Sequence, residues 1–86
     1  MTSSELEEIF ENHPTSPLRL TLSSGDTVDV DNPRRTIIEQ LALYIGQSDD
    51  PDARQAQRVK VVSMPNIVLV EQIDRRMLNG RRRRRR

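Results

Sequence analysis

The stretch LRLTLSSGDTVDVD, residues 18–31, decides the fold of this 86-residue chain. Aliphatic residues alternate with polar ones on both sides of its centre, which is the period of two that marks strands with one buried face. The stretch therefore predicts a β-hairpin that the rest of the chain packs around. Its inward residues would be Leu18, Leu20, Leu22, Val28 and Val30.

The length of the turn follows from the need to keep the leucines and valines on one face. A two-residue turn would place Leu20 opposite Asp29, so that apolar and acidic side chains would share a face. A three-residue loop over 23–25 instead places Leu20 opposite Val28, and its last residue, Gly25, adopts a left-handed conformation at little cost. The same register pairs Leu18 with Val30, Arg19 with Asp29 and Thr21 with Thr27.

The composition predicts a single small domain over residues 1–80 and a disordered arginine tail over residues 81–86. Six of the 14 basic residues lie in that tail, so the rest of the chain carries eight basic residues against 13 acidic ones. The domain is thus acidic, although the net charge of the chain is +1. Because there is no cysteine, no apolar run of membrane-spanning length and no signal-peptide pattern, we expect a cytoplasmic bacterial protein without disulfides.

Residues 3–13 predict a short amphipathic helix ahead of the hairpin. Ser4 and Glu7 have the spacing of a capping box, and Pro14 and Pro17 end the helix. A helix this short does not persist alone, so its apolar face must pack on the sheet. That face would carry Leu6, Ile9, Phe10 and His13.

Residues 36–47 fit two interpretations. Apolar residues at helical spacing would suit a helix, whereas alternation over residues 41–47 would suit a strand. We favour a turn or short helix followed by a strand over 41–47, because Tyr44-Ile45-Gly46 is typical of a strand end. Residues 48–57, SDDPDARQAQ, are polar and contain a proline, which predicts a mobile loop.

Two further strands are expected near the end of the chain. Residues 58–63 form one, with Val59 and Val61 on the same face, and residues 67–73 form the other. The predicted fold is mainly β within the α+β class. It has an N-terminal helix followed by about five antiparallel strands in a small barrel or a strongly bent sheet.

Prolines, a glycine turn and a closing aliphatic strand recur in this order at Pro14, Pro17, Leu18, Arg19, Leu20, Leu22, Gly25, Val30, Pro33 and residues 67–71. The pattern resembles that of a set of small bacterial proteins of unknown function. In this chain Thr15 and Leu18 replace the phenylalanines that usually flank the prolines, and Asn32 replaces a histidine. The order of elements also looks like that of Sm-like and SH3-like barrels, without the Arg-Gly pair of the second Sm motif. The resemblance concerns architecture and implies no catalytic residue.

The last strand is apolar on both faces over Ile67, Val68, Leu69 and Val70. A strand of this kind needs a second layer to cover it. The N-terminal helix and a partner subunit are the two candidates. We therefore predict a non-enzymatic interaction module that self-associates, as a homo-oligomer, or docks a protein partner through this strand and its edge.

An accessory nucleic-acid-binding role is the alternative. Consecutive guanidinium groups bind phosphate backbones by releasing counterions, with steep salt dependence. The tail also fits a solvated disordered segment or an artificial extension. A further possibility is a basic segment that folds back on the acidic domain. The residues of the nucleic-acid hypothesis are Arg34, Arg35, Arg81, Arg82, Arg83, Arg84, Arg85 and Arg86.

Enzymatic and metal chemistry are not favoured. The aspartates at 26, 29 and 31 and those at 49, 50 and 52 lack the ligand spacing of a calcium loop. His13 stands at a helix end, where contact with the helix dipole is the simpler role, and Ser23 and Ser24 have no base in sequence context. We expect no cofactor, no metal and no catalytic residue.

Overall fold

The computed structural model describes residues 1–50, 54–74 and 76. The arginine tail therefore lies outside the described residues. The α+β class is confirmed, with one helix at the start and strands after it. The elements are α1 (Ser3–Asn12), β1 (Leu18–Leu22), β2 (Thr27–Val30), β3 (Thr36–Ile38), β4 (Ala42–Gln47), β5 (Arg58–Ser63) and β6 (Ile67–Gln72), with 3-10 helices at Pro33–Arg35 and Met64–Asn66.

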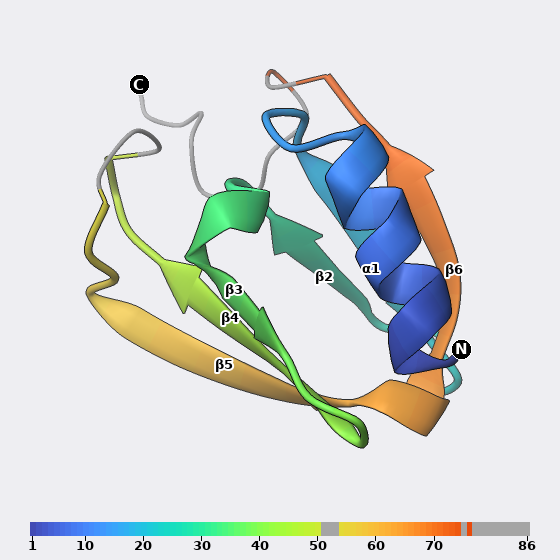
Figure 1. The fold of residues 1–86 in the computed structure, drawn as a ribbon. Coiled ribbons are helices and arrows are strands. Elements are labelled where there is room, and N and C mark those ends of the chain that lie inside the picture. Colours follow the sequence, from blue (N-terminus) through green and yellow to red (C-terminus); the bar gives the residue numbers. More distant parts are fainter. Residues whose placement is uncertain (51–53, 75, 77–86) are drawn as a thin grey trace.

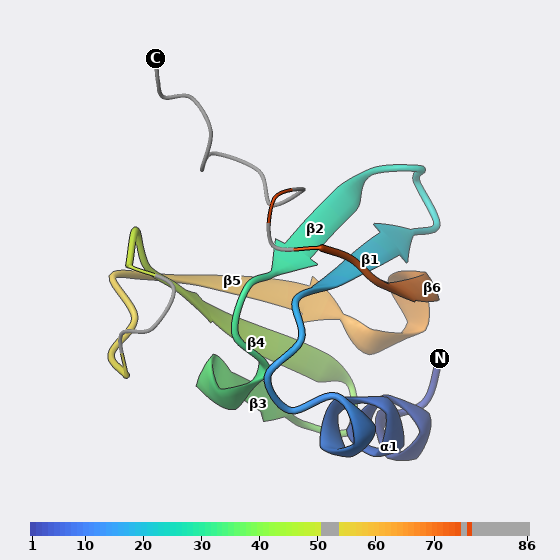
Figure 2. The same ribbon diagram turned by 90° about the horizontal axis from the view of Figure 1, so that it is seen from above.

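The described strands form two antiparallel three-stranded sheets, in the orders β2-β1-β6 and β3-β4-β5 (Figure 1). The expected barrel is wrong, because the described strands leave the two sheets unjoined by hydrogen bonds. The described residues form six strands, where about five were expected. The sheets face each other, and α1 lies beside β3 along one open side of the pair (Figure 2).

The additional strand is β3, at the start of the segment that fitted two interpretations. The turn or short helix expected at the start of residues 36–47 is wrong: a 3-10 helix lies earlier, at Pro33–Arg35, and Thr36–Ile38 is a strand that pairs with β4. Three consecutive β-branched residues favour extended backbone, which explains the strand. The strand expected over 41–47 begins at Ala42, and the helical interpretation is wrong.

The hairpin of β1 and β2 has the predicted register. Leu20 pairs with Val28 and Arg19 with Asp29, and Gly25 has a φ of +95° at the end of a three-residue loop. The guanidinium of Arg19 donates two hydrogen bonds to the Asp29 carboxylate, at 2.7 and 3.1 Å. These bonds raise the pKa of Arg19 above its ordinary value. The outer face of the hairpin is therefore held by a bidentate ion pair.

The helix begins two residues earlier than the Ser4–Glu7 box implies. Thr2 is the N-cap: its hydroxyl accepts the Glu5 N–H at 3.2 Å, and the Glu5 carboxylate accepts the Thr2 N–H at 2.9 Å. The hydrogen bonds that the Glu5 carboxylate accepts from the backbone N–H and the hydroxyl of Thr2 lower the pKa of Glu5. Both boxes satisfy the spacing, but the structure uses the Thr2 box, and the Leu6 N–H then donates to the Thr2 carbonyl at 3.1 Å as the first turn of the helix.

The core lies between the two sheets and under α1. Both inner faces of the strands contribute aliphatic residues, as the alternation of the hairpin predicts. From the helix, Leu6 and Phe10 close the side of the core, as expected for two members of the predicted apolar face. The buried residues of this core are Leu6, Phe10, Leu18, Leu20, Val28, Val30, Leu43, Ile45, Val62, Met64 and Ile67.

A β-bulge changes the facing of residues in β6. The pairing with β1 runs Thr21 with Leu69 and Leu22 with Ile67, so Val68 is the extra residue between them. The bulge turns Ile67 into the core and leaves Val68 and Leu69 on the surface. For Ile67 the covering layer is the chain's own core, which includes Leu6 of the helix.

Candidate interaction surfaces

The outer part of β6 is the first candidate surface. Of the four residues predicted to form an interaction strand, Ile67 is fully buried and Val70 is half-buried. Val68 and Leu69 are 58% and 48% exposed. Only these two side chains are therefore available to a partner.

The free edge of β6 is the second part of this surface. Within the described residues, β6 pairs with β1 on one side only, and the N-terminal ammonium donates to the Ile67 carbonyl at 3.1 Å. A partner strand could pair with the remaining backbone groups. Exposed apolar edges of this kind are templates for pairing, which proteins commonly block with charges or short strands.

The other sheet edges that the structure describes are short strands or carry charged residues. β2 has four residues and carries Asp29, and β3 has only three residues. β5 has six residues but carries Arg58 and Lys60. β6 also has six residues, and its first four are uncharged. Among the edges that the structure describes, β6 thus presents the longest uncharged backbone.

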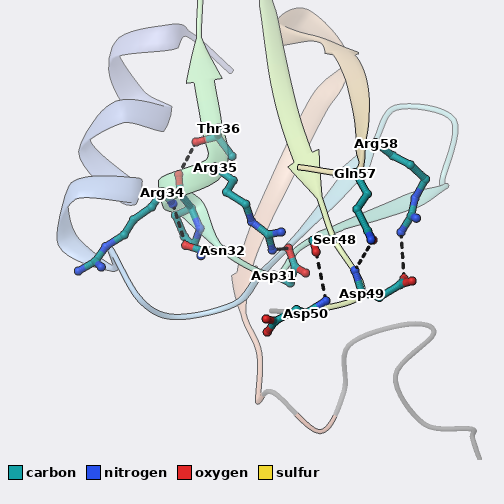
Figure 3. Close-up of polar contacts among 11 residues, drawn as sticks. Asp31, Asn32, Arg34, Arg35, Thr36, Ser48, Asp49, Asp50, Gln57 and Arg58 are labelled. Atoms are coloured by element: carbon teal, nitrogen blue, oxygen red, sulfur yellow. Dashed lines mark hydrogen bonds and ion pairs between the residues drawn. The ribbon is translucent and has the colours of Figure 1, made fainter. Parts of the chain in front are cut away.

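Arg34 and Arg35 are the two described arginines of the nucleic-acid hypothesis, and their side chains point in different directions (Figure 3). Arg34 is exposed, and its backbone N–H donates to the Asn32 side chain at 3.0 Å. The side chain of Arg35 is only 3% exposed and lies 3.0 Å from Asp31 in an ion pair. Arg34 is accessible to a phosphate, whereas Arg35 is engaged inside the protein.

The Arg35–Asp31 pair joins the two sheets, since Asp31 directly follows β2 and Arg35 directly precedes β3. The 3.0 Å contact is an ion pair without the angle of a hydrogen bond, and Nε, Nη1 and Nη2 of Arg35 have no hydrogen-bond partner among the described residues. A buried guanidinium with so few acceptors depends strongly on the one carboxylate beside it.

The residues considered for catalysis have local structural partners. The backbone N–H of His13 donates to the carbonyls of Ile9 and Phe10, at 3.1 and 3.2 Å, and so ends α1. Ser23 lies 3.5 Å from the Asn66 side chain, and Ser24 donates to Asp26 at 3.2 Å. These contacts place the two serines in turns, and neither of the two side-chain partners, Asn66 and Asp26, is a histidine.

The acidic loop after β4 is built from short polar contacts (Figure 3). The Asp49 N–H donates to Gln57 at 2.9 Å, and the Asp50 N–H donates to the Ser48 hydroxyl at 3.1 Å. Asp49 also lies 3.4 Å from Arg58. Asp52 lies outside the described residues. Over residues 1–50, 54–74 and 76, no group of three or more acidic or histidine side chains is placed to hold a metal ion.

Two hollows lined by described residues lie where the two facing sheets leave an open side. One, of about 320 Å³, lies between α1 and the segment around β3, with Phe10, Pro33 and Ile38 as its apolar part. Glu7 and Glu11 line it from the helix and Arg34 from the other wall. The other, of about 620 Å³, lies between β2 and β5, where the sheets do not meet. Neither hollow is lined by His13.

The outward face of β3, β4 and β5 was not identified as a surface from the sequence. Val59 and Val61 were predicted to share a face, and that face points outward, with exposures of 62% and 61%. Tyr44 and Ile37 are exposed beside them. The available signal was the alternation of Tyr44 with the buried Leu43 and Ile45, which places it on the opposite face.

Comparison of the chain with protein-family models, with curated proteins and with solved structures found no match. In the part of the chain that the structure describes, none of the helices has the length and apolar character needed to cross a bilayer. The function is therefore inferred from the surfaces themselves.

Proposed function

We propose that the protein is a non-enzymatic interaction module that docks an extended segment of another protein chain at the free edge of β6. The observation that carries this proposal is the six-residue edge of β6, uncharged over its first four residues, next to two exposed aliphatic side chains, Val68 and Leu69. The other described edges are short or charged, so they do not offer an equivalent site.

Docking by strand addition uses two kinds of contact. The backbone of the incoming strand pairs with the free N–H and C=O groups of β6, which supplies affinity with little sequence preference. Leu69 lies on the outer face of its sheet, opposite Thr21, so it would contact a side chain on the outer face of the incoming strand, where every second residue points. We expect the partner segment to be extended, with aliphatic residues at alternate positions.

The test uses peptides selected from a displayed random library against the full chain. The variant Leu69→Lys is expected to weaken their binding by about tenfold or more, because a lysine ammonium would be desolvated at the contact. Val61→Lys, which places the same charge on the other sheet, is the matched control and is expected to bind normally. Amide hydrogen exchange is expected to show new protection in β6 on binding.

Two results would contradict the docking proposal. Peptides that bind equally well to wild type and Leu69→Lys do not use this surface. Protection that appears in β3 or β5 and leaves β6 unchanged would place the contact on the other sheet.

The nucleic-acid hypothesis is kept as the second candidate function. It depends on Arg81–Arg86, which lie outside the described residues, with the exposed Arg34 as the one described contributor. Deletion of residues 81–86 is expected to abolish binding to single- or double-stranded DNA, and the binding before deletion is expected to weaken steeply with salt. Binding that survives the deletion unchanged would exclude the tail as its cause.

A further inference from the structure

The outward face of the β3–β4–β5 sheet has no charged side chain among its described positions. Charged residues make up 31% of the chain. An outer face of three strands without a charged residue therefore has fewer charges than the chain as a whole would predict. Four apolar residues, Ile37, Tyr44, Val59 and Val61, are exposed on it, and interaction surfaces commonly carry contiguous exposed apolar residues. By alternation from the buried residues, the outward positions are Ile37, Ala42, Tyr44, Val59, Val61 and Ser63, together with Gly46, which is itself buried beneath Arg35 and Ala56.

Three of these residues form a row straight across the sheet. The register places Ile37 opposite Tyr44, and Tyr44 opposite Val61. Their exposed fractions are 61%, 38% and 61%. An aromatic side chain therefore stands at the centre, with an aliphatic side chain on the strand to each side, so the row has nearly the same chemistry when it is read from either end.

We propose that this face is the contact between two copies of the chain, packed face to face about a two-fold axis that passes at Tyr44. Rotation about this axis exchanges the ends of the row, so Ile37 of one copy lies over Val61 of the other and the two Tyr44 rings meet. In an isologous contact each surface meets its own copy. An uncharged face then meets an uncharged face, and no charge has to lose its water.

The size of the face decides how strong the dimer is. β4 and β5 have six residues each, and with a rise of about 3.3 Å per residue and a spacing of about 4.8 Å the three strands cover roughly 20 by 14 Å. Two such faces bury less than the roughly 1,200–2,000 Å² of a stable interface. The dimer is therefore weak and forms as the concentration rises.

This contact is separate from the docking edge of β6. The face belongs to the β3-β4-β5 sheet, whereas β6 belongs to the other sheet (Figure 1). Both surfaces can therefore be occupied at once, and a variant in one leaves the other intact. Failure of the dimer does not bear on strand docking, and failure of strand docking does not bear on the dimer.

Sedimentation velocity of the full chain from micromolar to millimolar concentration is the first test. The wild type is expected to shift from monomer to dimer. Val61→Lys is expected to raise the dissociation constant by about tenfold or more, because it places two unpaired ammonium groups in the contact. Leu69→Lys is the matched control on the other sheet and is expected to dimerise like the wild type. A wild type that stays monomeric, or a Val61→Lys variant that dimerises equally well, overturns the proposal.

Cysteine cross-linking gives a second test that does not depend on a charged variant. The chain has no cysteine, so single substitutions report one position each. Tyr44→Cys is expected to form disulfide dimers under mild oxidation. A mixture of Ile37→Cys and Val61→Cys is expected to give mainly the mixed dimer, since the axis brings 37 of one copy to 61 of the other. Cross-links that form equally within Ile37→Cys alone, or that fail at Tyr44→Cys, contradict the axis.

Discussion

Replacement of Asp31 by alanine is expected to lower the free energy of unfolding by about 3–5 kcal/mol, the cost typical of removing one partner from a buried ion pair. The Arg35 side chain is 3% exposed and faces Asp31 at 3.0 Å. Without the carboxylate, the guanidinium remains buried with no hydrogen-bond partner among the described residues. Urea unfolding monitored by circular dichroism measures the loss.

The double variant Asp31→Ala/Arg35→Met is the control for this prediction. Methionine fills much of the volume of the arginine stem without its charge, so the double variant is expected to be more stable than Asp31→Ala alone. Arg35→Met alone is expected to cost less than Asp31→Ala, because Asp31 keeps 14% of its side chain exposed to water. A double variant whose loss equals the sum of the two single losses would show that the charges do not interact.

Replacement of Gly46 by alanine is expected to destabilise the fold by about 2–3 kcal/mol, in the upper part of the range for overpacking. A Cβ at this position would lie 2.8 Å from the Arg35 carbonyl oxygen and 2.8 Å from the Cβ of Ala56. Both are parts of the chain that cannot rotate away. Valine adds two more carbons at the same place, so Gly46→Val is expected to prevent folding, as shown by the loss of a cooperative thermal transition.

Gly25 provides the matched control for Gly46. Nothing lies within 4 Å of a Cβ built on Gly25, but its φ of +95° disfavours side chains. Asparagine tolerates positive φ better than other residues, so Gly25→Asn is expected to cost less than Gly46→Ala. A larger loss of stability in Gly25→Asn than in Gly46→Ala would contradict this. It would show that the residues around Gly46 move easily and that the conformation of Gly25 matters more for stability.

The hairpin could be predicted in detail because several independent requirements agree in its sequence. Alternation sets the faces, the pairing of Arg19 with Asp29 fits the outer face, and Gly25 fits the end of the loop, so one register satisfies all of them. The sequence around the bulge at Val68 contains no comparable signal. Its flanking residues are aliphatic on both sides, so a shift of register changes no local pattern.

The burial of Arg35 could not be predicted from its neighbours. It follows Arg34 after a proline, and a basic pair in a turn is typical of exposed surface. The local sequence does not show that Asp31, four residues earlier, lies within 3.0 Å. That contact depends on the sharp connection between the two sheets, which is a tertiary feature.

The facing of β5 was open for a similar reason. Amphipathic alternation alone would bury Val59 and Val61 and expose Lys60. In the structure Lys60 takes an inward position and lines the hollow between β2 and β5, where it remains exposed. The gap between the sheets therefore accommodates the charged side chain, and the valines face outward.

The pairing of β1 with β6 has a consequence for synthesis on the ribosome. Leu18 pairs with Gln72, so the first strand and the last strand lie side by side. The hairpin of β1 and β2 can form as soon as it emerges, but its sheet is completed only after synthesis has reached Gln72. Pairing of distant segments slows folding. During that interval the inner leucines of β1 stay in water, and a nascent chain is then most dependent on a chaperone.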